Sequence, residues 1–334
     1  MDFKGILRTI LKICVPLFFG CMLLWLLYRK MDFKEIREVI RYGVRYDILL
    51  LSLLFGTFAN TVRALRWKLL ITSMGDRPKT MNTVWAVYGN YALNLVLPRI
   101  GELWRCGVIK KYDNISFTKL LGTLLVDRVS DSVVVGFMTL VIVIFNVEFF
   151  TDFFHMNPEL LQGFRAMLNS IWIYAAAAVL VLGTWIVFRY MKRYSIVIKA
   201  REMLLNIWEG IKTIWFLKQK GLFLFETLMI WAGYFFFFYI TFYAFEFTKD
   251  LGIVVGLITF TMCSIGVGVP VQGGIGPWHF MVIATLICFG VNKNDAAAFA
   301  LIVHTTQTVW TGLVGLVGIA ALPISNRKPE PVAE

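Results

Sequence analysis

The chain has 334 residues, of which 58% are hydrophobic and only 16% charged, and its mean hydropathy is +0.71. Soluble domains average about 45–50% apolar and about 25% charged residues, so this composition excludes a soluble protein and predicts a membrane protein. The net charge of +12 does not indicate nucleic-acid binding, because Lys and Arg cluster at the ends of apolar runs, where they set membrane topology and contact lipid headgroups.

Apolar runs follow one another along the chain, and no strand-like alternation is visible. Runs of roughly 20 residues cross a hydrocarbon core of about 30 Å as helices. We predict an all-α polytopic bundle of about eight transmembrane helices, with re-entrant or broken segments. The expected spans are 10–28, 46–62, 120–147, 171–188, 222–246, 252–270, 277–291 and 296–322, and a shorter, more polar segment lies at 82–98.

The domain organisation is expected to be simple. No linker or long loop interrupts the apolar pattern, so we predict one transmembrane domain over 1–324 and a disordered cytoplasmic tail at 325–334. The first apolar run is expected to be retained, because no signal-peptide cleavage site follows it. The five cysteines are scattered, which indicates packing residues; we expect no metal and no cofactor. They are Cys14, Cys21, Cys106, Cys263 and Cys288.

Basic residues indicate the orientation of the spans. The loop 189–220 is rich in Lys and Arg, which predicts a cytoplasmic position, whereas 148–170 is acidic overall and is expected outside. Counting spans from these loops places both termini on the cytoplasmic side of the cell (inner) membrane. The basic stretch 29–47 then lies outside, which we explain by an amphipathic helix at 34–45 along the interface. A second surface helix is expected at 201–217.

The first group of polar residues is Arg63 and Arg66, which share a helix face just after the run 46–62. As positive-inside anchors they would mark the end of a span, beside an interfacial Trp67. As a phosphate clamp they would use the planar donor fork of arginine. The residue types leave both interpretations open.

The second group lies in and just after the polar segment 82–98. Asn90 and Asn94 lie one turn apart on one helix face, where unsatisfied amides in lipid are costly. They are suited to hydrogen bonding between helices. We favour a re-entrant segment that ends at Pro98 and delivers three charged residues to a polar cavity. These are Arg99, Glu102 and Arg105.

Charged residues also interrupt the run 120–147. Asp127 and Asp131, with Arg128 between them in sequence, share a helix face and repel each other unless a cation lies opposite. A structural ion-pair network and a substrate or proton role both fit, because charges inside an apolar run face a cavity or a partner. A metal is disfavoured, because no His stands near. The available cations are Arg63, Arg99 and Arg105.

A glycine-rich break separates the last runs. Pro270 and Pro277 bracket it, so the backbone leaves the helix and restarts at Pro277, a favoured first helical position. A helix broken at membrane depth lines a cavity or is buried in protein, and the free N–H groups of the new helix suit an anion. His279 in the new helix and His304 in the last span are candidates for proton relay or for packing. The glycines expected to offer backbone donors are Gly273, Gly274 and Gly276.

The breaks near Pro98 and Pro270 are separated by about half the chain. Short, interrupted segments at matching places in two halves indicate an inverted-repeat transporter with its site at the midplane. We therefore expect the two breaks to build one site.

Four motifs, taken in order, resemble the lysylphosphatidylglycerol synthase transmembrane-region family, the flippase-like integral membrane proteins of bacteria and archaea. The resemblance covers nearly the whole chain. The motifs are Arg63-x-x-Arg66-Trp67, Asn94-x-x-x-Pro98-Arg99-x-Gly101-Glu102-x-x-Arg105, Asp127-Arg128-x-x-Asp131 and Pro270-x-x-Gly273-Gly274-x-Gly276.

The resemblance implies a multi-pass bundle similar to the lipid-translocating half of the bacterial multiple peptide resistance factors. In those proteins a soluble acyltransferase domain makes the aminoacyl lipid, and we expect this chain to lack that domain. Many members carry an acidic residue after the Gly-Gly-x-Gly turn, where this chain has Trp278 and His279.

We therefore expect a flippase-like lipid transporter, not an enzyme, that handles an aminoacyl-phospholipid or a polyprenyl-phosphate-linked sugar. The alternatives are a membrane-embedded lipid or glycosyl transferase with Asp127 or Glu102 as base, and an accessory subunit of a separate lipid-modifying synthase. Phosphate would bind to Arg63, Arg66, Arg99, Arg105 and the three glycines. The residues expected to orient these groups, or to meet a headgroup or a proton, are Asn90, Asn94, Glu102, Asp127, Arg128, Asp131 and His279.

Overall fold

The computed structural model describes residues 18, 22, 25, 28, 29, 32–190 and 217–327. Throughout these ranges the secondary structure is helical, and the β pairing is limited to one isolated bridge between Val44 and Phe245. The predicted all-α class is therefore confirmed. The expected helix at 201–217, most of the expected span 10–28 and the tail beyond 327 lie outside the described residues.

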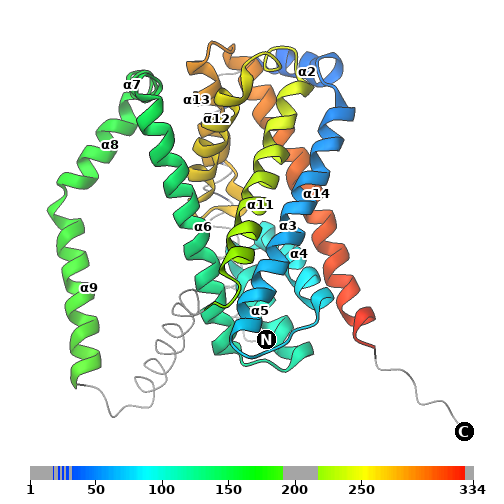
Figure 1. The fold of residues 1–334 in the computed structure, drawn as a ribbon. Helices are drawn as coiled ribbons and strands as arrows, with labels where there is room; N and C mark the ends of the chain where they lie inside the picture. Colours follow the sequence, from blue (N-terminus) through cyan, green and yellow to red (C-terminus); the bar gives the residue numbers. More distant parts are fainter. Residues whose placement is uncertain are drawn as a thin grey trace, which may run out of the picture.

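Four of the described helices are long and apolar enough to cross a membrane. In Figure 1, α3 and α14 run downward through the bundle, whereas α6 and α11 run upward. The four are α3 (Tyr46–Ser73), α6 (Phe117–Phe145), α11 (Lys220–Tyr239) with its 3-10 extension η1 (Ile240–Ala244), and α14 (Lys293–Ser325).

One boundary differs from its prediction in a way that matters for the site. Helix α3 continues past the expected end at residue 62 to Ser73. Arg63 and Arg66 consequently lie inside a helix of the bundle, on one face as expected, and not beyond the end of the span. The apolar run ends early because the helix face beyond it is polar, not because the helix stops.

A helical hairpin occupies the lower half of the bundle between α3 and α6 (Figure 1). It consists of α4 (Thr80–Val96) and α5 (Ile100–Asp113). Leu97 is extended, with φ −141° and ψ 118°, which is the conformation that Pro98 imposes on the residue before it. The predicted break of the polar segment at Pro98 is therefore confirmed.

The two arms of this hairpin touch at their backbones. A Cβ atom on Gly101 would lie only 2.0 Å from the carbonyl oxygen of Asn90. The Gly101 amide donates a hydrogen bond of 2.9 Å to Asn94 Oδ1. Asn94 therefore joins the two arms, and glycine at 101 permits the approach.

A second hairpin occupies the upper half between α11 and α14 (Figure 1). Its arms are α12 (Gly252–Val267) and α13 (Pro277–Cys288), joined by a turn that contains η2 (Gln272–Gly274). Gly276, with φ 94°, precedes Pro277 at the start of α13, as the Pro/Gly pattern predicts.

The spans expected at 252–270 and 277–291 are corrected by this hairpin. Helices α12 and α13 have 16 and 12 residues. At 1.5 Å per residue they measure about 24 and about 18 Å, which is less than a hydrocarbon core of about 30 Å and at most half the length of α14, which has 33 residues. They are the two arms of one half-depth hairpin and not two separate crossings.

The tips of the two hairpins meet inside the bundle. A Cβ atom on Gly273 in the upper turn would lie 3.2 Å from Leu95 Cδ2 near the lower tip. Helix α14 packs along α4 through Gly315, where a Cβ atom would lie 2.6 Å from Ala92 Cβ. Small residues thus bring the long helix and both hairpins into direct contact.

The upper end of the bundle carries α2 (Phe33–Tyr42), which confirms a helix within the expected segment 34–45. Asp32 caps it by accepting a 2.7 Å hydrogen bond from the Lys34 amide. Ile36 is buried against the start of α14, which the structure places beside it. Helix α2 is therefore a docked element of this end.

Three further helices lie to one side of the bundle. They are α7 (Val147–Met156), α8 (Pro158–Asn169) and α9 (Ile171–Tyr190). Helix α7 contacts α13 through the stacked rings of Phe149 and Phe289, whose centroids are 5.3 Å apart. Helix α9, which coincides with the expected span 171–188, stands apart from the bundle in Figure 1.

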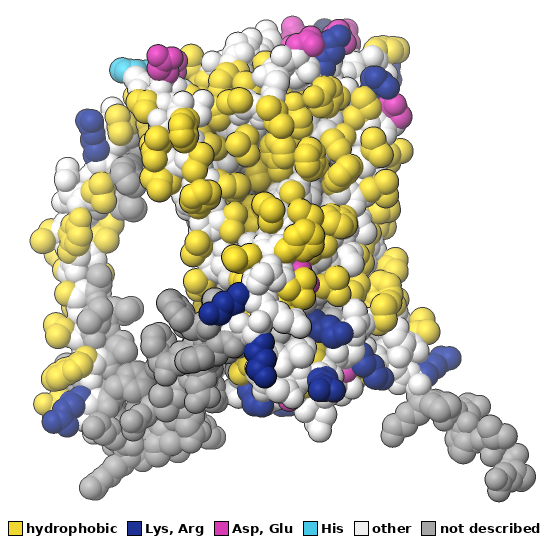
Figure 2. Space-filling model, viewed as in Figure 1, with side chains coloured by type: hydrophobic (Ala, Val, Ile, Leu, Met, Phe, Trp, Pro, Cys, Tyr) yellow, Lys and Arg dark blue, Asp and Glu magenta, His cyan; other side chains and the backbone are white. Residues whose placement is uncertain are grey.

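The surface matches the predicted charge pattern. Figure 2 shows a wide hydrophobic band between two charged ends, with Lys and Arg gathered at the lower end. The described segments at that end carry Arg77, Lys79, Lys110, Lys111, Lys119, Lys218, Lys220 and Arg327, against Asp76 and Asp113. The upper end mixes acidic and basic side chains (Figure 2).

Candidate functional site

A buried cluster of charges joins four helices in the lower half of the bundle. Arg66 of α3 lies at its centre and is 0% exposed. Its Nη2 lies 2.6 Å from Asp127 Oδ1 and 2.7 Å from Asp131 Oδ1 on α6. Its Nη1 donates to the hydroxyl of Thr227 on α11 at 3.1 Å. All three guanidinium nitrogens of Arg66 are thus engaged.

Arg63, one turn earlier on α3, holds the second carboxylate. Its Nη1 donates to Asp131 Oδ2 at 2.5 Å, and its Nε donates to the hydroxyl of Tyr234 on α11 at 3.0 Å. Tyr234 in turn donates to Asn60 Oδ1 at 2.6 Å and lies 2.8 Å from the hydroxyl of Tyr91 on α4. Hydrogen bonds therefore extend from the charges towards the middle of the bundle.

Arg105 of α5 brings the lower hairpin into the cluster. Its Nη2 donates to Asp127 Oδ2 at 2.9 Å, and its guanidinium lies over the Trp67 ring at 4.5 Å. The side chain is fully buried, yet its Nε and Nη1 have no hydrogen-bond partner among the described residues. Arg105 therefore has two buried donors that no described residue uses.

The burial of these side chains contradicts one interpretation of the sequence. Arg63 and Arg66 are 3% and 0% exposed and Trp67 is 0% exposed, so they are not an interfacial anchor. Removing several charges from water carries a large cost, which close pairing with the two aspartates offsets. The expected phosphate role of Arg66 now requires that a phosphate displace one of its carboxylate partners.

Four further predicted residues lie at the edge of this cluster and at the hairpin contact. Arg128 Nε lies 3.1 Å from Glu102 Oε1, and both side chains are partly exposed. Asn90 is buried, and its Nδ2 has no partner among the described residues. The hydrogen-bonding role expected for the asparagines holds for Asn94, which binds the opposite arm.

Arg99 is not part of the cluster. It occupies the tip of the lower hairpin in a left-handed conformation, with φ 64° and ψ −2°, which is uncommon for a residue with a side chain. Its side chain is exposed, and it makes no hydrogen bond or ion pair with the residues that the structure describes. Of the three cations that the sequence offered to Asp127 and Asp131, Arg63 and Arg105 pair with them and Arg99 does not.

The upper turn forms a separate polar region. His304 Nε2 lies 2.8 Å from the carbonyl oxygen of Gly273, so this ring nitrogen donates. The Gly276 amide donates to His279 Nδ1 at 3.5 Å, and the two imidazole centroids lie 4.5 Å apart. Both histidines are buried. These bonds agree with the packing interpretation of the histidines, and they occupy the Gly276 amide that was expected to meet an anion.

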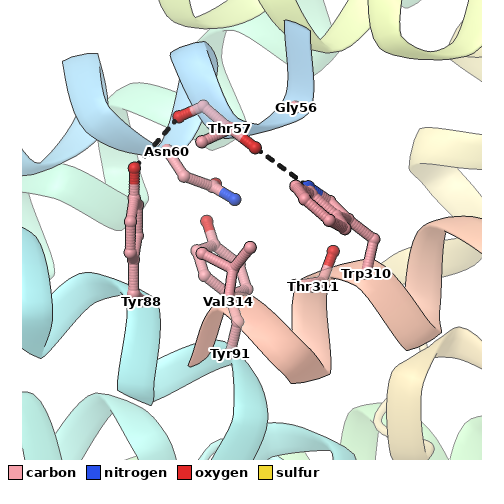
Figure 3. Close-up of a pocket in the computed structure, with 8 residues that line it drawn as sticks. All are labelled: Gly56, Thr57, Asn60, Tyr88, Tyr91, Trp310, Thr311 and Val314. Carbon is pink, nitrogen blue, oxygen red and sulfur yellow. Dashed lines mark hydrogen bonds between the residues drawn. The ribbon is translucent and has the colours of Figure 1, made fainter. Parts of the chain in front are cut away.

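A small polar cavity lies between α3, α4 and α14, close to the hairpin tips (Figure 3). Trp310 Nε1 donates to Thr57 Oγ1 at 2.9 Å across its wall, and Asn60 and Tyr91 connect the wall to Tyr234 and Arg63. The lining residues are Gly56, Thr57, Asn60, Tyr88, Tyr91, Trp310, Thr311 and Val314.

Comparison with known proteins supports the resemblance found in the sequence. The family model of the lysylphosphatidylglycerol synthase TM region matches residues 13–315. The chain belongs to this family. No curated protein and no solved structure matches it.

Membership of the lysylphosphatidylglycerol synthase TM family, together with the four long apolar helices, establishes a multi-pass membrane protein. The matched region contains every predicted site residue. The fold brings Arg63, Arg66, Arg105, Asp127 and Asp131 together and leaves Arg99 apart. Within the described part of this family member, no group of three His, Cys, Asp or Glu side chains is placed to hold a metal ion.

The sequence interpretation missed Glu226. This residue is the one charged side chain after Lys220 in α11, and it is 8% exposed. The signal that identified Asp127, a charge inside an apolar run, is present here too and indicates a functional residue. Tyr234 and Asn60 carried no comparable signal, because neutral polar residues are common in membrane helices.

Proposed function

We propose that this protein moves an anionic lipid across the membrane, with the two hairpin tips and the arginines of the lower half forming its path. The observation that carries the proposal is the meeting of two half-depth hairpins beside Arg99, an exposed and unpaired arginine. Half-depth helices at membrane depth line a cavity or are buried in protein.

The depth of Arg99 supports an anionic ligand. Helix α4 has 17 residues, which place the tip roughly 25 Å above the lower end at 1.5 Å per residue. An unpaired charge at such a depth in hydrocarbon is costly, so intramembrane charges face a polar path and a partner. A lipid phosphate is a partner that arginine binds through two parallel hydrogen bonds.

The order of the helices supports a transporter. In both halves a long helix is followed by a half-depth hairpin and a second long helix, and the directions are opposite (Figure 1). We infer an inverted repeat, in which α3 to α6 and α11 to α14 are equivalent units. Transporters of this kind place their site where the repeats meet, at the midplane. The polar cavity of Figure 3 lies in this region.

A lipid-movement assay with an Arg99→Ala variant tests this function. Proteoliposomes would contain fluorescent phosphatidylglycerol, and its exposure on the outer leaflet would be followed with a membrane-impermeant quencher. Because a hydrogen bond to a charged group contributes about 1.5–3 kcal/mol, we expect Arg99→Ala to slow movement by roughly tenfold to a hundredfold.

The matched control is Arg77→Ala, which removes an exposed arginine at the lower end and should leave the rate unchanged. Absence of movement of any anionic lipid by the native protein would exclude the proposal. Movement that is equally fast in Arg99→Ala would exclude the hairpin tip as the path. If cells that carry Arg99→Ala in place of the native protein keep the native phenotype, the alternative role as an accessory subunit of a separate lipid-modifying synthase is favoured.

The orientation in the membrane is proposed from charge. Lys and Arg gather at the lower end in Figure 2, so the positive-inside rule places that end in the cytoplasm and α2 outside. In a background with alanine at the five cysteine positions, Lys34→Cys should react with an impermeant maleimide on intact cells. Lys110→Cys should react only after the cells are opened. The reverse pattern would invert the proposed orientation.

A further inference from the structure

A buried carboxyl group next to the charge cluster has no assigned role. Glu226 lies on α11, and its Oε2 is buried without a hydrogen-bond partner among the described residues. No arginine or lysine in the described part of the chain forms an ion pair with it. An unpaired buried carboxylate is costly, so this position is suited to a group that gains and loses a proton.

The surroundings of Glu226 are apolar on one side and positive on the other. Phe223, one turn earlier on α11, packs with Leu70, Val126 and Leu217. Arg66 of α3 reaches α11 beside Glu226: its Nη1 donates to the hydroxyl of the next residue, Thr227, at 3.1 Å, and its guanidinium lies 5.6 Å from the Phe223 ring centroid.

Other elements packed against α11 add little charge near Glu226. Helix α12 and the η1 extension contain no charged residue. On α3, Arg63 binds Asp131 and Lys68 donates to Thr80, and on α6 the carboxylates of Asp127 and Asp131 are both bound by Arg66. Glu226 therefore responds mainly to the charge of Arg66 and of the cluster behind it.

The cluster itself is not neutral. Its three arginines face two aspartates, which leaves one positive charge in excess. Ionised Glu226 balances that excess. A phosphate monoanion on the free Nε and Nη1 donors of Arg105 would balance it equally well. If Glu226 were ionised while a phosphate was also bound, the cluster of arginines and aspartates with these two anions would carry a net negative charge. A net charge is unfavourable in a buried medium of low dielectric constant.

We propose that Glu226 is a proton-binding site that couples proton movement to the binding of an anionic headgroup. Glu226 is ionised while the cluster holds no lipid, and its carboxylate accepts one proton from water when a phosphate reaches Arg105. The proton leaves again when the lipid leaves, so lipid and proton move together. This inference rests on the proposed function, because the lipid is the anion that exchanges with the carboxylate charge.

The route of the proton is short. Glu226 lies six positions after Lys220 at the start of α11, which is roughly 9 Å of helix at 1.5 Å per residue. The basic lower end is thus the side from which the carboxyl group takes its proton. The proton stays on Glu226 while the phosphate is bound at Arg105, and it returns to water when the lipid leaves.

Proteoliposomes with a pH-sensitive dye inside and fluorescent phosphatidylglycerol in the membrane test the coupling. An imposed pH gradient should drive net lipid movement in the native protein, and lipid movement should change the internal pH. In Glu226→Gln, whose side chain cannot titrate, we expect at least a tenfold loss of gradient-driven lipid accumulation while passive exchange continues. Glu226→Asp should restore part of the coupling. The matched control, Glu246→Gln, alters an exposed glutamate that pairs with Lys249 and should behave as the native protein.

Two results separate the inference from the proposed function. The proton site would be overturned if lipid moved without any change of internal pH and if Glu226→Gln responded to the pH gradient as the native protein does. Lipid transport itself would then still stand. If the native protein moves no lipid, infrared difference spectra decide the site independently. A carboxylic-acid band that forms when phosphatidylglycerol nanodiscs replace phosphatidylcholine nanodiscs, and that is absent in Glu226→Gln, would support the site. Its absence in the native protein would overturn it.

Discussion

Replacement of Asp127 by alanine is expected to lower the free energy of unfolding by about 3–5 kcal/mol, the range found when one partner of a buried ion pair is removed. Asp127 is 0% exposed and accepts from both Arg66 and Arg105. Its loss would leave Arg105 without any carboxylate partner and would remove the buried ion pair between α5 and α6. Equilibrium unfolding in mixed micelles, followed by circular dichroism, measures the change.

The neighbouring pairs supply controls for Asp127→Ala. Asp131→Ala should cost less, because the Asp131 side chain is 12% exposed and water can reach the arginines that it leaves. Asp76→Ala removes a partly exposed pair with Lys119 at the lower end and should change stability by about 0–1 kcal/mol. Equal losses in Asp127→Ala and Asp76→Ala would show that the cluster does not stabilise the fold.

Replacement of Gly101 by alanine is expected to destabilise the protein by about 3 kcal/mol, the upper part of the range for overpacking. The new Cβ would lie 2.0 Å from the Asn90 carbonyl oxygen, which belongs to the backbone of the opposite arm and cannot rotate away. The arms must therefore separate, which also weakens the hydrogen bond from Gly101 to Asn94. The same unfolding measurement applies.

Gly107→Ala is the matched control on the same helix, because a Cβ atom there meets nothing within 4 Å. Alanine favours a helix over glycine by about 0.5–1 kcal/mol, so this variant should gain stability. The two glycine variants of α5 should therefore differ in sign. If Gly101→Ala and Gly107→Ala were both destabilised, α5 would tolerate no added side chain. The loss in Gly101→Ala could then not be attributed to the backbone contact with Asn90.

The Gly101→Ala variant also tests how the hairpin controls function. Arg99 and Arg105 lie on either side of Gly101, one at the tip and one in the charge cluster. Separating the arms shifts both arginines relative to α3 and α6. We expect this variant to lose lipid movement even at temperatures where it remains folded.

The sequence by itself determined the class of this protein and the places where its helices break. Hydrophobicity over about 20 residues decides membrane insertion, because hydrocarbon offers no partners to backbone polar groups. The breaks at Pro98 and Pro270 also follow from local chemistry, because proline excludes the preceding residue from the helix. Both effects depend on residues within one segment, so membrane insertion and helix breaks can be predicted from the sequence alone.

Only the tertiary structure decided which charges meet and which short helices form hairpins. Arg66 and Asp127 are separated by 61 residues, and nothing near either shows that α3 and α6 place them in contact. Arg99 resembled the other cations in sequence but lies at a tip, and only the structure shows that the Glu226 carboxyl group is buried without an ion-pair partner among the described residues. Long-range pairing depends on how all the helices pack together, a property that no single segment carries.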